Sequence, residues 1–548
     1  MIDQTARSAL SVSRRSLFRL GLAGGALAAT PLAAQMRSGF THGVASGEPG
    51  PTSMLLWTRY VASQPTALQW EVATDDSFAR VVAGGTVEAS AARDGCVKPV
   101  ATGLDPATCY SYRFIAPGGT KSATGRTRTL PVGKTDRFRM AVFGCSNIGY
   151  GWFNAYAHAA AAGEFDLAVH TGDYLYEYAR GTYPDADAAV RAEMVDPLDE
   201  IVSLADYRAR YAAYRDDPAL LRLHQLLPMV ATWDDHESTN DSWRDGAQNH
   251  QPATEGSWDV RKAAAKQAYR EWMPVSDEPW ASYEIGDLAT LFRVDSRLEG
   301  RDEAPDLSKI LSGVSSTAEA FAALTTFRDG AWRDPARSMY GPVQEAWLQD
   351  GIAASSRGGK RWQVLVNQTI MGTLGAASSL LDDVPASVPA DLRRRLQAAL
   401  GAARSGLPLN FDAWDGYPAA RERLLTASLD ADANLVVLTG DSHNGWAFEL
   451  AQDGTPAGVE FAGQSVTSPG FETYLPWVAP DRLARELVAA NEQLVWANTG
   501  ARGYMAVELT PDAANSEWRF SASVKTRDAS VTGSHRQTAA YGSRRLTG

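Results

Sequence analysis

The sequence lacks an excess of positive charge. Its 52 lysine and arginine residues are outnumbered by 64 aspartate and glutamate residues, which gives a formal net charge of −12. We therefore expect no nucleic-acid-binding surface, because such binding depends on basic side chains that release counterions. A small phosphorylated substrate is not excluded, since bound cations can invert the local field. Beyond residue 34 the sequence also lacks an apolar run of the ~20 residues that a membrane-spanning helix needs, so we expect no transmembrane segment.

Cysteine is scarce, and its number is odd: Cys96, Cys109 and Cys145. In an oxidising compartment one pair can form a disulfide, and the third thiol is then left over. Cys96 and Cys109 lie near two consecutive predicted strands, so they are either a disulfide or two buried free thiols. The sequence favours neither alternative. Cys145 requires a separate explanation.

The first 34 residues have the pattern of an export signal. A region rich in arginine comes first, the apolar stretch 20–29 follows, and small residues at 32–34 suit a cleavage site. Residues 13–18 resemble a twin-arginine signal in which Leu17 and Phe18 are exchanged relative to the usual order. The alternative is a general secretory signal with a chance arginine pair. We expect the twin-arginine translocation machinery as a partner, and a periplasmic or secreted monomer.

The chain of 548 residues is too long for one hydrophobic core, so two or more domains are expected. Between Phe40 and Thr129, short runs with alternating apolar and polar residues are separated by turn signals. This pattern predicts an N-terminal β-sandwich of immunoglobulin or fibronectin type over residues 38–130. Residues 131–134 are the expected linker.

After the linker, apolar β-branched runs alternate with longer helical stretches. This alternation is typical of an α/β domain with layered sheets flanked by helices, here over residues 136–525. Residues 376–410 are interpreted as a helical insertion or loop cover, and residues 526–548 as a polar tail that frays. Six strands are predicted to build the domain: Phe138–Gly144, Leu167–Thr171, Met229–Trp233, Ala289–Asp295, Trp362–Asn367 and Leu435–Thr439.

Residue types that bind metals follow four of these strands. Ligands bind outside the carboxyl ends of the strands in open α/β sheets, so four such clusters are expected to converge on one site. The clusters are Cys145-Ser146-Asn147, Gly172-Asp173-Tyr174-Leu175-Tyr176-Glu177, Asp234-Asp235-His236-Glu237 and Gly440-Asp441-Ser442-His443-Asn444.

The spacing within the clusters suits a shared ion. Asp173 follows a glycine, which lets the backbone turn sharply, and Tyr176 lies three residues further on. Asp441 and His443 are two residues apart, so they share a face of an extended segment. Each signal alone is weak, because a Gly-Asp pair is usually a turn and a lone histidine is usually structural. The order of the clusters and their position at strand ends make the set specific.

Two further features point to bound cations. The adjacent carboxylates of Asp234 and Asp235 repel each other unless a cation lies nearby. A lone cysteine is usually a small buried hydrophobic residue. Beside carboxylates, however, the Cys145 thiol makes sense as a thiolate held by a metal.

The combination of Gly-Asp-x-x-Tyr, a short acidic motif ending in His-Glu, and Gly-x-x-His resembles the calcineurin-like metallophosphoesterases and purple acid phosphatases. More closely, the sequence resembles the PhoD-type alkaline phosphatases over about residues 40–525. The segments that carry this resemblance are Thr41–Pro49, Leu56–Arg59, His170–Tyr178, Trp233–Glu237, Val294–Arg297, Gly440–His443 and Arg502–Met505.

The resemblance implies a cluster of one iron(III) and calcium. The iron ligands it implies are Cys145, Asp173, Tyr176 and His443. It also implies that Asp173 bridges to calcium, which Asp235 and Asp441 hold as well, with Asn240 as a weaker candidate. The donor atoms agree with this division, because thiolate, phenolate and imidazole suit a transition metal and oxygen ligands suit calcium.

The expected reaction is in-line attack of a metal-activated hydroxide on the phosphorus of a phosphate ester. His236 is assigned to the phosphate oxygens or to protonation of the leaving group, oriented by Glu237 or Asp234. Asp235 and Asn147 complete the candidate catalytic residues, with Asn147 as a hydrogen-bond donor to the phosphate. Asp295 and Arg297 face the substrate or support the ligands, unless they form a structural salt bridge. Neither Ser146 nor Ser442 lies in a Gly-x-Ser-x-Gly nucleophile elbow.

Three functions are weighed. The first is hydrolysis of phosphate monoesters or diesters outside the cytoplasm, for phosphate scavenging. The second is phospholipase D-like cleavage of phospholipids, for which Trp152, Trp243 and Trp272 are candidate rim residues. The third is a non-catalytic, exported calcium-binding protein, and the complete ligand set with His236 present argues against it.

Overall fold

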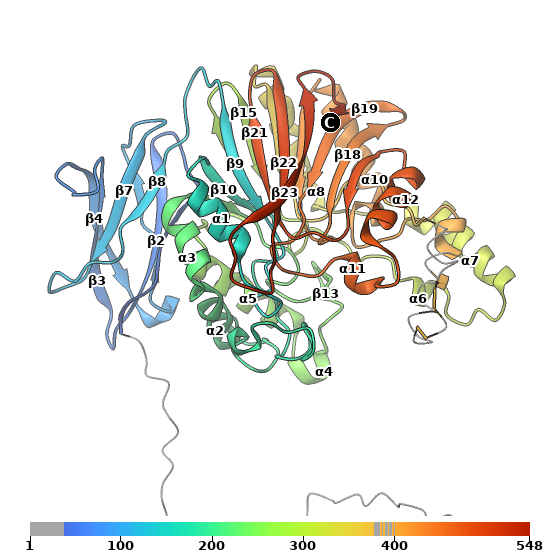
Figure 1. Ribbon diagram of the computed structural model, residues 1–548, viewed down its shortest axis with the longest axis horizontal. Coiled ribbons are helices and arrows are strands. Elements are labelled where there is room, and N and C mark those ends of the chain that lie inside the picture. The colour runs from blue at the N-terminus through green and yellow to red at the C-terminus, as the bar shows by residue number, and fades with distance from the viewer. Residues whose placement is uncertain (1–37, 378–383, 386, 389–392, 394–396, 399–400) are drawn as a thin grey trace, which may run out of the picture. The chain divides into compact units, whose positions relative to one another are not determined.

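The computed structural model describes residues 38–548 except 378–383, 386, 389–392, 394–396 and 399–400. The expected signal sequence therefore lies outside the described residues, as does much of the 376–410 segment. Two large β-sheets form the centre of the described chain (Figure 1). Among the described residues, no helix is long and apolar enough to cross a membrane.

The first sheet has eleven strands, and its parallel centre is β9, β10 and β11. These three strands confirm the first three predicted ones to within three residues at each end. In order across the sheet the strands are β24 (Leu546–Thr547), β23 (Val531–Ala540), β22 (Ala513–Ser521), β21 (Gly503–Leu509), β9 (Phe138–Phe143), β10 (Leu167–His170), β11 (Pro228–Ala231), β1 (Gly39–Gly47), β2 (Ser53–Val61) and β5 (Cys96–Val97), with β6 (Val100–Thr102) also paired to β2.

The second sheet has seven strands, and β15, β16, β17 and β19 run parallel within it. Its members are β14 (Ala281–Ile285), β15 (Ala289–Arg293), β16 (Trp362–Val366), β17 (Leu435–Thr439), β19 (Thr455–Ala462), β18 (Gly445–Gln452) and β20 (Leu494–Asn498). One apolar cluster joins the two sheets: it contains Met140 and Val169 of the first and Val364 and Val436 of the second. The sheets therefore pack face to face.

Helices cover the outer faces of both sheets (Figure 1). The helices that pack beside the first sheet are α1 (Asn154–Ala162), α2 (Leu204–Arg215), α3 (Pro218–Leu226) and α5 (Trp258–Trp272), and those beside the second are α8 (Gly341–Arg357), α10 (Pro418–Asp430) and α12 (Pro480–Ala490). Capping residues fix the N-termini of two of these helices. Ser203 and Asp206 form a capping box for α2, and Asp217 caps α3 ahead of Pro218. Shorter helices are α4 (Pro252–Glu255), α6 (Leu307–Ile310) and α11 (Phe471–Tyr474), and α7 (Thr317–Asp329) lies in a separate small cluster.

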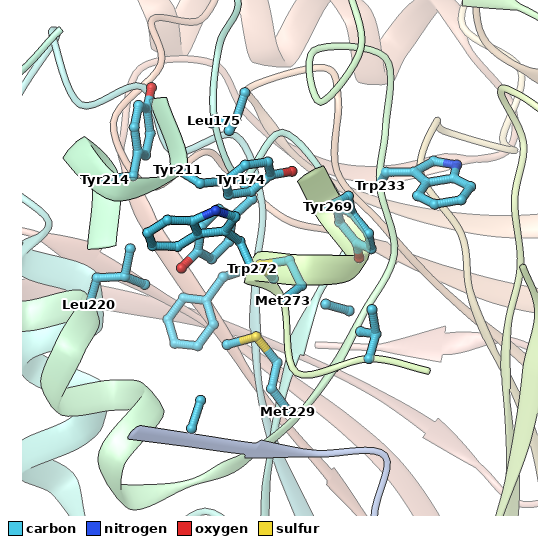
Figure 2. Packing of buried hydrophobic residues seen from close by; sticks show 14 of the residues in the cluster. Tyr174, Leu175, Tyr211, Tyr214, Leu220, Met229, Trp233, Tyr269, Trp272 and Met273 are labelled. Atoms are coloured by element: carbon cyan, nitrogen blue, oxygen red, sulfur yellow. The ribbon is translucent and has the colours of Figure 1, made fainter. Parts of the chain in front are cut away.

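The core beside the first sheet supports the loop that follows β10. Tyr174 and Leu175 of this loop are fully buried and pack with Tyr211, Trp272 and their neighbours (Figure 2). The rings of Tyr211 and Trp272 are stacked, with centroids 6.5 Å apart. Because two residues of the loop are held in this core, Asp173 and Tyr176 on either side of them are fixed in position. Trp272 is 0 % exposed, so the prediction that it lies on a substrate rim is wrong.

The N-terminal region shares strands with the first sheet. A four-stranded sheet of β4 (Val81–Ala89), β3 (Thr66–Ala73), β7 (Cys109–Ile115) and β8 (Gly125–Arg128) packs against β1 and β2 through an apolar cluster. However, β1 also pairs in parallel with β11, through Ser46 and Gly47. The two-layered arrangement agrees with the expected sandwich, but one of its layers continues into the large sheet. The immunoglobulin-type topology and the boundary near residue 130 stay predictions.

Two other expectations are resolved by the described residues. Cys96 and Cys109 are both free thiols, Cys96 buried and Cys109 exposed, so the disulfide alternative is not observed. The expected frayed tail is wrong, because β23 pairs along β22 from Val531 to Ala540 and β24 pairs with β23. The tail is ordered since Gln537, Ala539 and Leu546 are buried against the sheet.

Candidate metal centre

The polar clusters meet at the carboxyl ends of strands from both sheets. Cys145 follows β9, Asp173 follows β10 and Asp235 follows β11, while Asp441 follows β17 of the second sheet. Ligand atoms of Cys145, Asp173 and His443 lie within 4.8 Å of one another. Two further groups of three residues meet the same distance criterion. Those groups are Asp173, Asp235 and His236, and Asp234, Asp235 and Asp441. Sharing of Asp173 and Asp235 makes the three groups one continuous site.

The backbone at these positions is strained. Cys145, Asp173, Asp441 and His443 all have left-handed φ values, between 55° and 60°. Such values are uncommon outside glycine and cluster at functional sites, where the surrounding structure enforces them. Gly172 has φ 116°, and a Cβ atom there would lie 2.4 Å from Cβ of Asp234. The glycine that the sequence places before Asp173 is therefore required for the close approach of two loops.

Sulfur, nitrogen and phenol donors lie on one side of the site. The Tyr176 hydroxyl donates to Oδ2 of Asp173 at 2.9 Å and lies 3.1 Å from Nε2 of His443. The Nδ1 atom of His443 lies 2.8 Å from the carbonyl oxygen of Pro469. Ser468, which sequence reasoning missed, donates to the Tyr176 oxygen at 2.7 Å. The oxygen of Tyr176 therefore lies within hydrogen-bond distance of both Asp173 and His443, so that these three side chains converge on one point.

Burial controls the protonation of this side. Burial raises the pKa of the Cys145 thiol well above its ordinary value, and Asp173 and Asp441 add to the effect. Burial and Asp173 likewise raise the pKa of Tyr176. Burial lowers the pKa of His443 to about 3, so its ring is neutral and able to bind a metal. A thiolate and a phenolate in this place need a compensating positive charge.

Carboxylates dominate the other side of the site. Asp234 is fully buried and burial raises its pKa to about 6, against the effect of Arg297. Burial raises the pKa of Asp441 well above its ordinary value, with Asp234 adding to the effect. Asp235 differs: burial acts to raise its pKa, but Arg297 and His236 hold it below the ordinary range. Burial also raises the pKa of Asp241, here to about 7.

The residues fit the implied cations. Among the described residues, Asp173 Oδ1, Asp234 Oδ2 and Asp235 Oδ1 are buried without a hydrogen-bond partner. Buried charged oxygens are costly unless a cation or a donor compensates them. The donor set divides as the chemistry of the two implied ions requires, with S, N and phenol O on one side and carboxylate O on the other.

His236 has a different partner from the two that were predicted. Its Nδ1 atom lies 2.7 Å from Oε2 of Glu177, a fully buried carboxylate. Neither Glu237 nor Asp234 orients the ring, so that prediction is wrong. Glu177 lies in the same sequence cluster as Asp173 and Tyr176, but no signal in the sequence indicated that it would contact His236, 59 residues away.

Glu237 joins two of the loops that carry ligands. Its carboxylate accepts hydrogen bonds from the backbone N–H groups of Asp173 at 3.1 Å, Tyr174 at 2.7 Å and Asp234 at 2.9 Å. The side chain is 2 % exposed. Glu237 therefore holds the two loops in position. It does not have the predicted role of orienting His236.

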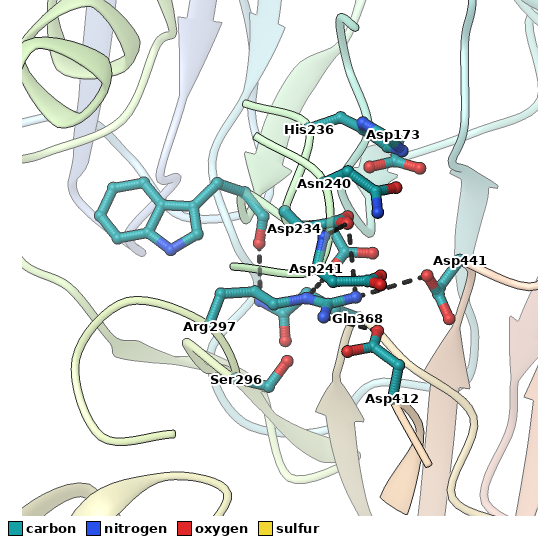
Figure 3. Close-up of polar contacts among 12 residues, drawn as sticks. Asp173, Asp234, His236, Asn240, Asp241, Ser296, Arg297, Gln368, Asp412 and Asp441 are labelled. Carbon is teal, nitrogen blue, oxygen red and sulfur yellow. Dashed lines mark hydrogen bonds and ion pairs between the residues drawn. The ribbon is translucent and has the colours of Figure 1, made fainter. Parts of the chain in front are cut away.

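Both candidate asparagines are near the site but are hydrogen-bonded to protein groups. Asn147 donates through Nδ2 to the carbonyl of Tyr183 at 3.2 Å, and its Oδ1 accepts from the N–H of Gly149 at 3.0 Å. Asn240 donates through Nδ2 to Gln248 at 3.0 Å. Figure 3 shows the Asn240 side chain between the labelled His236 and Asp234. The roles of Asn147 and Asn240 stay predictions.

Comparison with known proteins decides the family. The family described as "PhoD-like phosphatase" matches residues 140–518, and "PhoD-like phosphatase, N-terminal domain" matches residues 25–131. The chain belongs to the PhoD-like phosphatase family. Alkaline phosphatase D of Bacillus subtilis (strain 168) is 32 % identical over 510 residues, which cover 88 % of this chain and 77 % of the relative.

A solved structure agrees with this assignment. The structure titled "Structure of PhoD" superposes with a TM-score of 0.75 at 28 % identity, and the match covers 93 % of this chain and 92 % of that one. The resemblance seen in the sequence is thus confirmed, and the chain is a PhoD-like hydrolase of phosphoric esters.

Proposed function

We propose that this PhoD-like phosphatase is an exported, metal-dependent phosphatase or phosphodiesterase that scavenges phosphate. Cys145, Asp173, Tyr176 and His443 would hold iron(III), and Asp173, Asp235 and Asp441 would hold calcium. The observation that carries the proposal is the continuity of the site, in which Asp173 and Asp235 each belong to two of the three ligand groups. A phosphate ester bound across the two proposed cations would meet positive charge on both sides.

The two cations would supply Lewis acidity, lowering the pKa of a bound water and neutralising charge on the phosphate. His236 acts on the substrate. Because its Nδ1 is held by Glu177, the Nε2 atom is the one available to a phosphate oxygen or to the leaving group. Burial lowers the pKa of His236, but Asp235, Glu177 and Asp173 together raise it well above the ordinary value, so the ring can donate a proton near neutral pH.

Metal removal tests the proposal. Treatment with a strong chelator should abolish phosphate release, and calcium with iron(III) should restore it. Asp173→Ala should lower kcat by at least about 10³-fold, because it removes the ligand shared by both ions. Asp259→Ala is the matched control, since this carboxylate is exposed at the start of α5 and should leave kcat unchanged. Activity that survives the chelator or Asp173→Ala would refute the metal assignment.

The phospholipid alternative is less well supported. Trp272 is buried in the core, and the Trp152 ring lies 4.3 Å from the Arg191 guanidinium carbon, in a cation–π contact. Of the three rim candidates, Trp272 is thus inside the core, and Trp152 is half-buried and already engaged with Arg191. The third alternative, a non-catalytic protein, conflicts with membership of a hydrolase family. Comparing kcat/KM for monoesters, diesters and phospholipid vesicles would establish the substrate class, and a preference for vesicles would overturn the scavenging role.

A further inference from the structure

The guanidinium of Arg297 lies among the carboxylates of the calcium side. It donates through Nε to Asp234 and through Nη1 to Asp412 Oδ2 at 2.6 Å. Its Nη2 atom lies 3.4 Å from Asp441 Oδ1 and 3.6 Å from Asp235 Oδ1. Figure 3 shows the planar group surrounded by Asp234, Asp412 and Asp441. One fully buried side chain thus contacts four carboxylates.

These four carboxylates come from separate parts of the fold. Arg297 follows β15, Asp234 and Asp235 follow β11 of the other sheet, and Asp441 follows β17. The Arg297 backbone is itself fixed, because its N–H donates to Asp295 Oδ1 at 2.7 Å. Arg297 therefore ties the two sheets together at the point where the ligands meet.

We propose that Arg297 is a positioning residue that aligns Asp235 and Asp441 for a divalent cation. The inference rests on the proposed function, since it concerns the same cation. The two short contacts go to Asp234 and Asp412, which are not among the assigned ligands. The two longer contacts go to the assigned ligands Asp235 and Asp441.

The alternative effect of Arg297 is repulsion of the cation. A guanidinium without nearby anions would weaken cation binding by Coulomb repulsion. Here the charge of Arg297 is neutralised by Asp234 and by Asp412, which it shares with Arg301, so the two arginines and these two carboxylates carry no net charge together. Nη2 reaches one oxygen of Asp441 and leaves its Oδ2 atom to a cation, while Asp235 Oδ1 is buried without a hydrogen-bond partner. Alignment therefore outweighs repulsion.

Arg301 supplies a matched control. It is 1 % exposed and shares Asp412 with Arg297, donating to its carboxylate and, at 2.5 Å, to its backbone carbonyl. Its other partners are the carbonyl of Ser296, the sulfur of Met339 and the ring of Tyr417. Arg301 is thus a buried arginine that shares Asp412, and among the described residues none of these contacts goes to Asp235 or Asp441.

The test measures calcium affinity directly. Full-length protein depleted of calcium by a chelator is titrated with calcium alone in a calorimeter, as wild type, Arg297→Met, Arg297→Lys and Arg301→Met. We expect Arg297→Met to raise the dissociation constant about tenfold or more, because supporting residues of a metal site have effects of this size. Arg297→Lys, which keeps the charge but loses the planar fork, should give a smaller increase. Arg301→Met should stay within about twofold of wild type.

Two additional readouts separate positioning from general damage. Circular dichroism verifies folding, and if Arg297→Met does not fold, the comparison of Arg297→Lys with Arg301→Lys decides. The calcium concentration for half-maximal phosphate release should rise in Arg297→Met, with activity recovering as calcium is added. An unchanged or tighter calcium affinity in the Arg297 variants would overturn the proposal. If wild type itself binds no calcium, the proposed function fails in its calcium assignment, which is a distinguishable outcome.

Discussion

The Nδ1 atom of His236 lies 2.7 Å from Oε2 of Glu177, and this contact fixes the histidine that we propose acts on the substrate. The other carboxylate oxygen of Glu177 accepts from the N–H of Asn240 at 2.8 Å, from Thr239 Oγ1 at 3.1 Å and from Asn249 Nδ2 at 3.0 Å. The carboxylate cannot rotate without breaking these bonds. The imidazole is therefore held in one orientation by a group that is itself immobile.

Glu177→Gln should lower kcat by about 10- to 100-fold with a smaller change in KM, since the residue orients a catalytic group without binding substrate. Steady-state kinetics on a phosphomonoester would measure both constants. Glu200→Gln is the control, because Glu200 accepts from the same Asn249 amide but pairs with Arg261. Equal losses in the two variants would show that packing, and not the orientation of His236, is responsible.

The same substitution should change the pH profile of kcat. Asp235, Glu177 and Asp173 raise the pKa of His236, so the protonated ring persists to higher pH and is lost only as the pH rises through the raised value. Removal of the Glu177 charge lowers that pKa. The alkaline limb of the profile should therefore move to lower pH in Glu177→Gln, and a limb that stays in place would mean another group titrates.

Tyr176→Phe should abolish the visible absorption band expected of a phenolate bound to iron(III). The reason is that this substitution removes the hydroxyl lying 2.9 Å from Asp173 Oδ2 and 3.1 Å from His443 Nε2. Tyr183→Phe should keep the band, although its ring centroid is only 5.7 Å from that of Tyr176. Persistence of the band in Tyr176→Phe would show that the iron ligands are misassigned.

Glu237→Ala should destabilise the protein by about 3 kcal/mol or more, because three backbone N–H groups lose their buried acceptor. Since one of these groups belongs to the candidate ligand Asp173 and another to Asp234, the neighbour of the candidate ligand Asp235, metal affinity should fall as well. Chemical denaturation measures the free energy of unfolding, and Glu193→Ala, at an exposed position, provides the reference. A loss below about 1 kcal/mol would contradict the bridging role.

Ala539→Asp should lower the free energy of unfolding by about 2 kcal/mol or more, because it buries a charge in β23. Ala539 is 1 % exposed, whereas its neighbour Ala540 is exposed. Ala540→Asp should therefore be nearly neutral. Thermal unfolding of the two variants would decide whether the C-terminal strands belong to the fold or fray as the polar composition suggests.

Much of the site could be predicted from the sequence because its residues are adjacent to buried strands. Cys145, Asp173 and Asp441 each lie two or three residues after the end of a buried strand, so the apolar run locates the strand and the strand locates the candidate ligand. Partners distant in sequence had no such signal. Ser468 contacts Tyr176 from 292 residues away, and Asp412 reaches Arg297 from 115 residues away.

The fold shows the same division. Local periodicity predicted the central strands, but the extent of the N-terminal layer and the fate of the tail depended on pairing with distant strands. β1 is drawn into the large sheet by β11, and β23 is ordered by β22. Polar composition alone cannot reveal an edge strand whose order comes from a neighbour's hydrogen bonds.

The sequence by itself identified the candidate metal ligands, since residue type and position after a strand are local properties. Only the tertiary structure decided that Glu177 and not Glu237 orients His236, and that Arg297 lies among four carboxylates from both sheets. The physical reason is that a buried charge is stabilised by whichever partner the packing brings within hydrogen-bond distance. Distance in space, unlike order along the chain, is set by the whole fold.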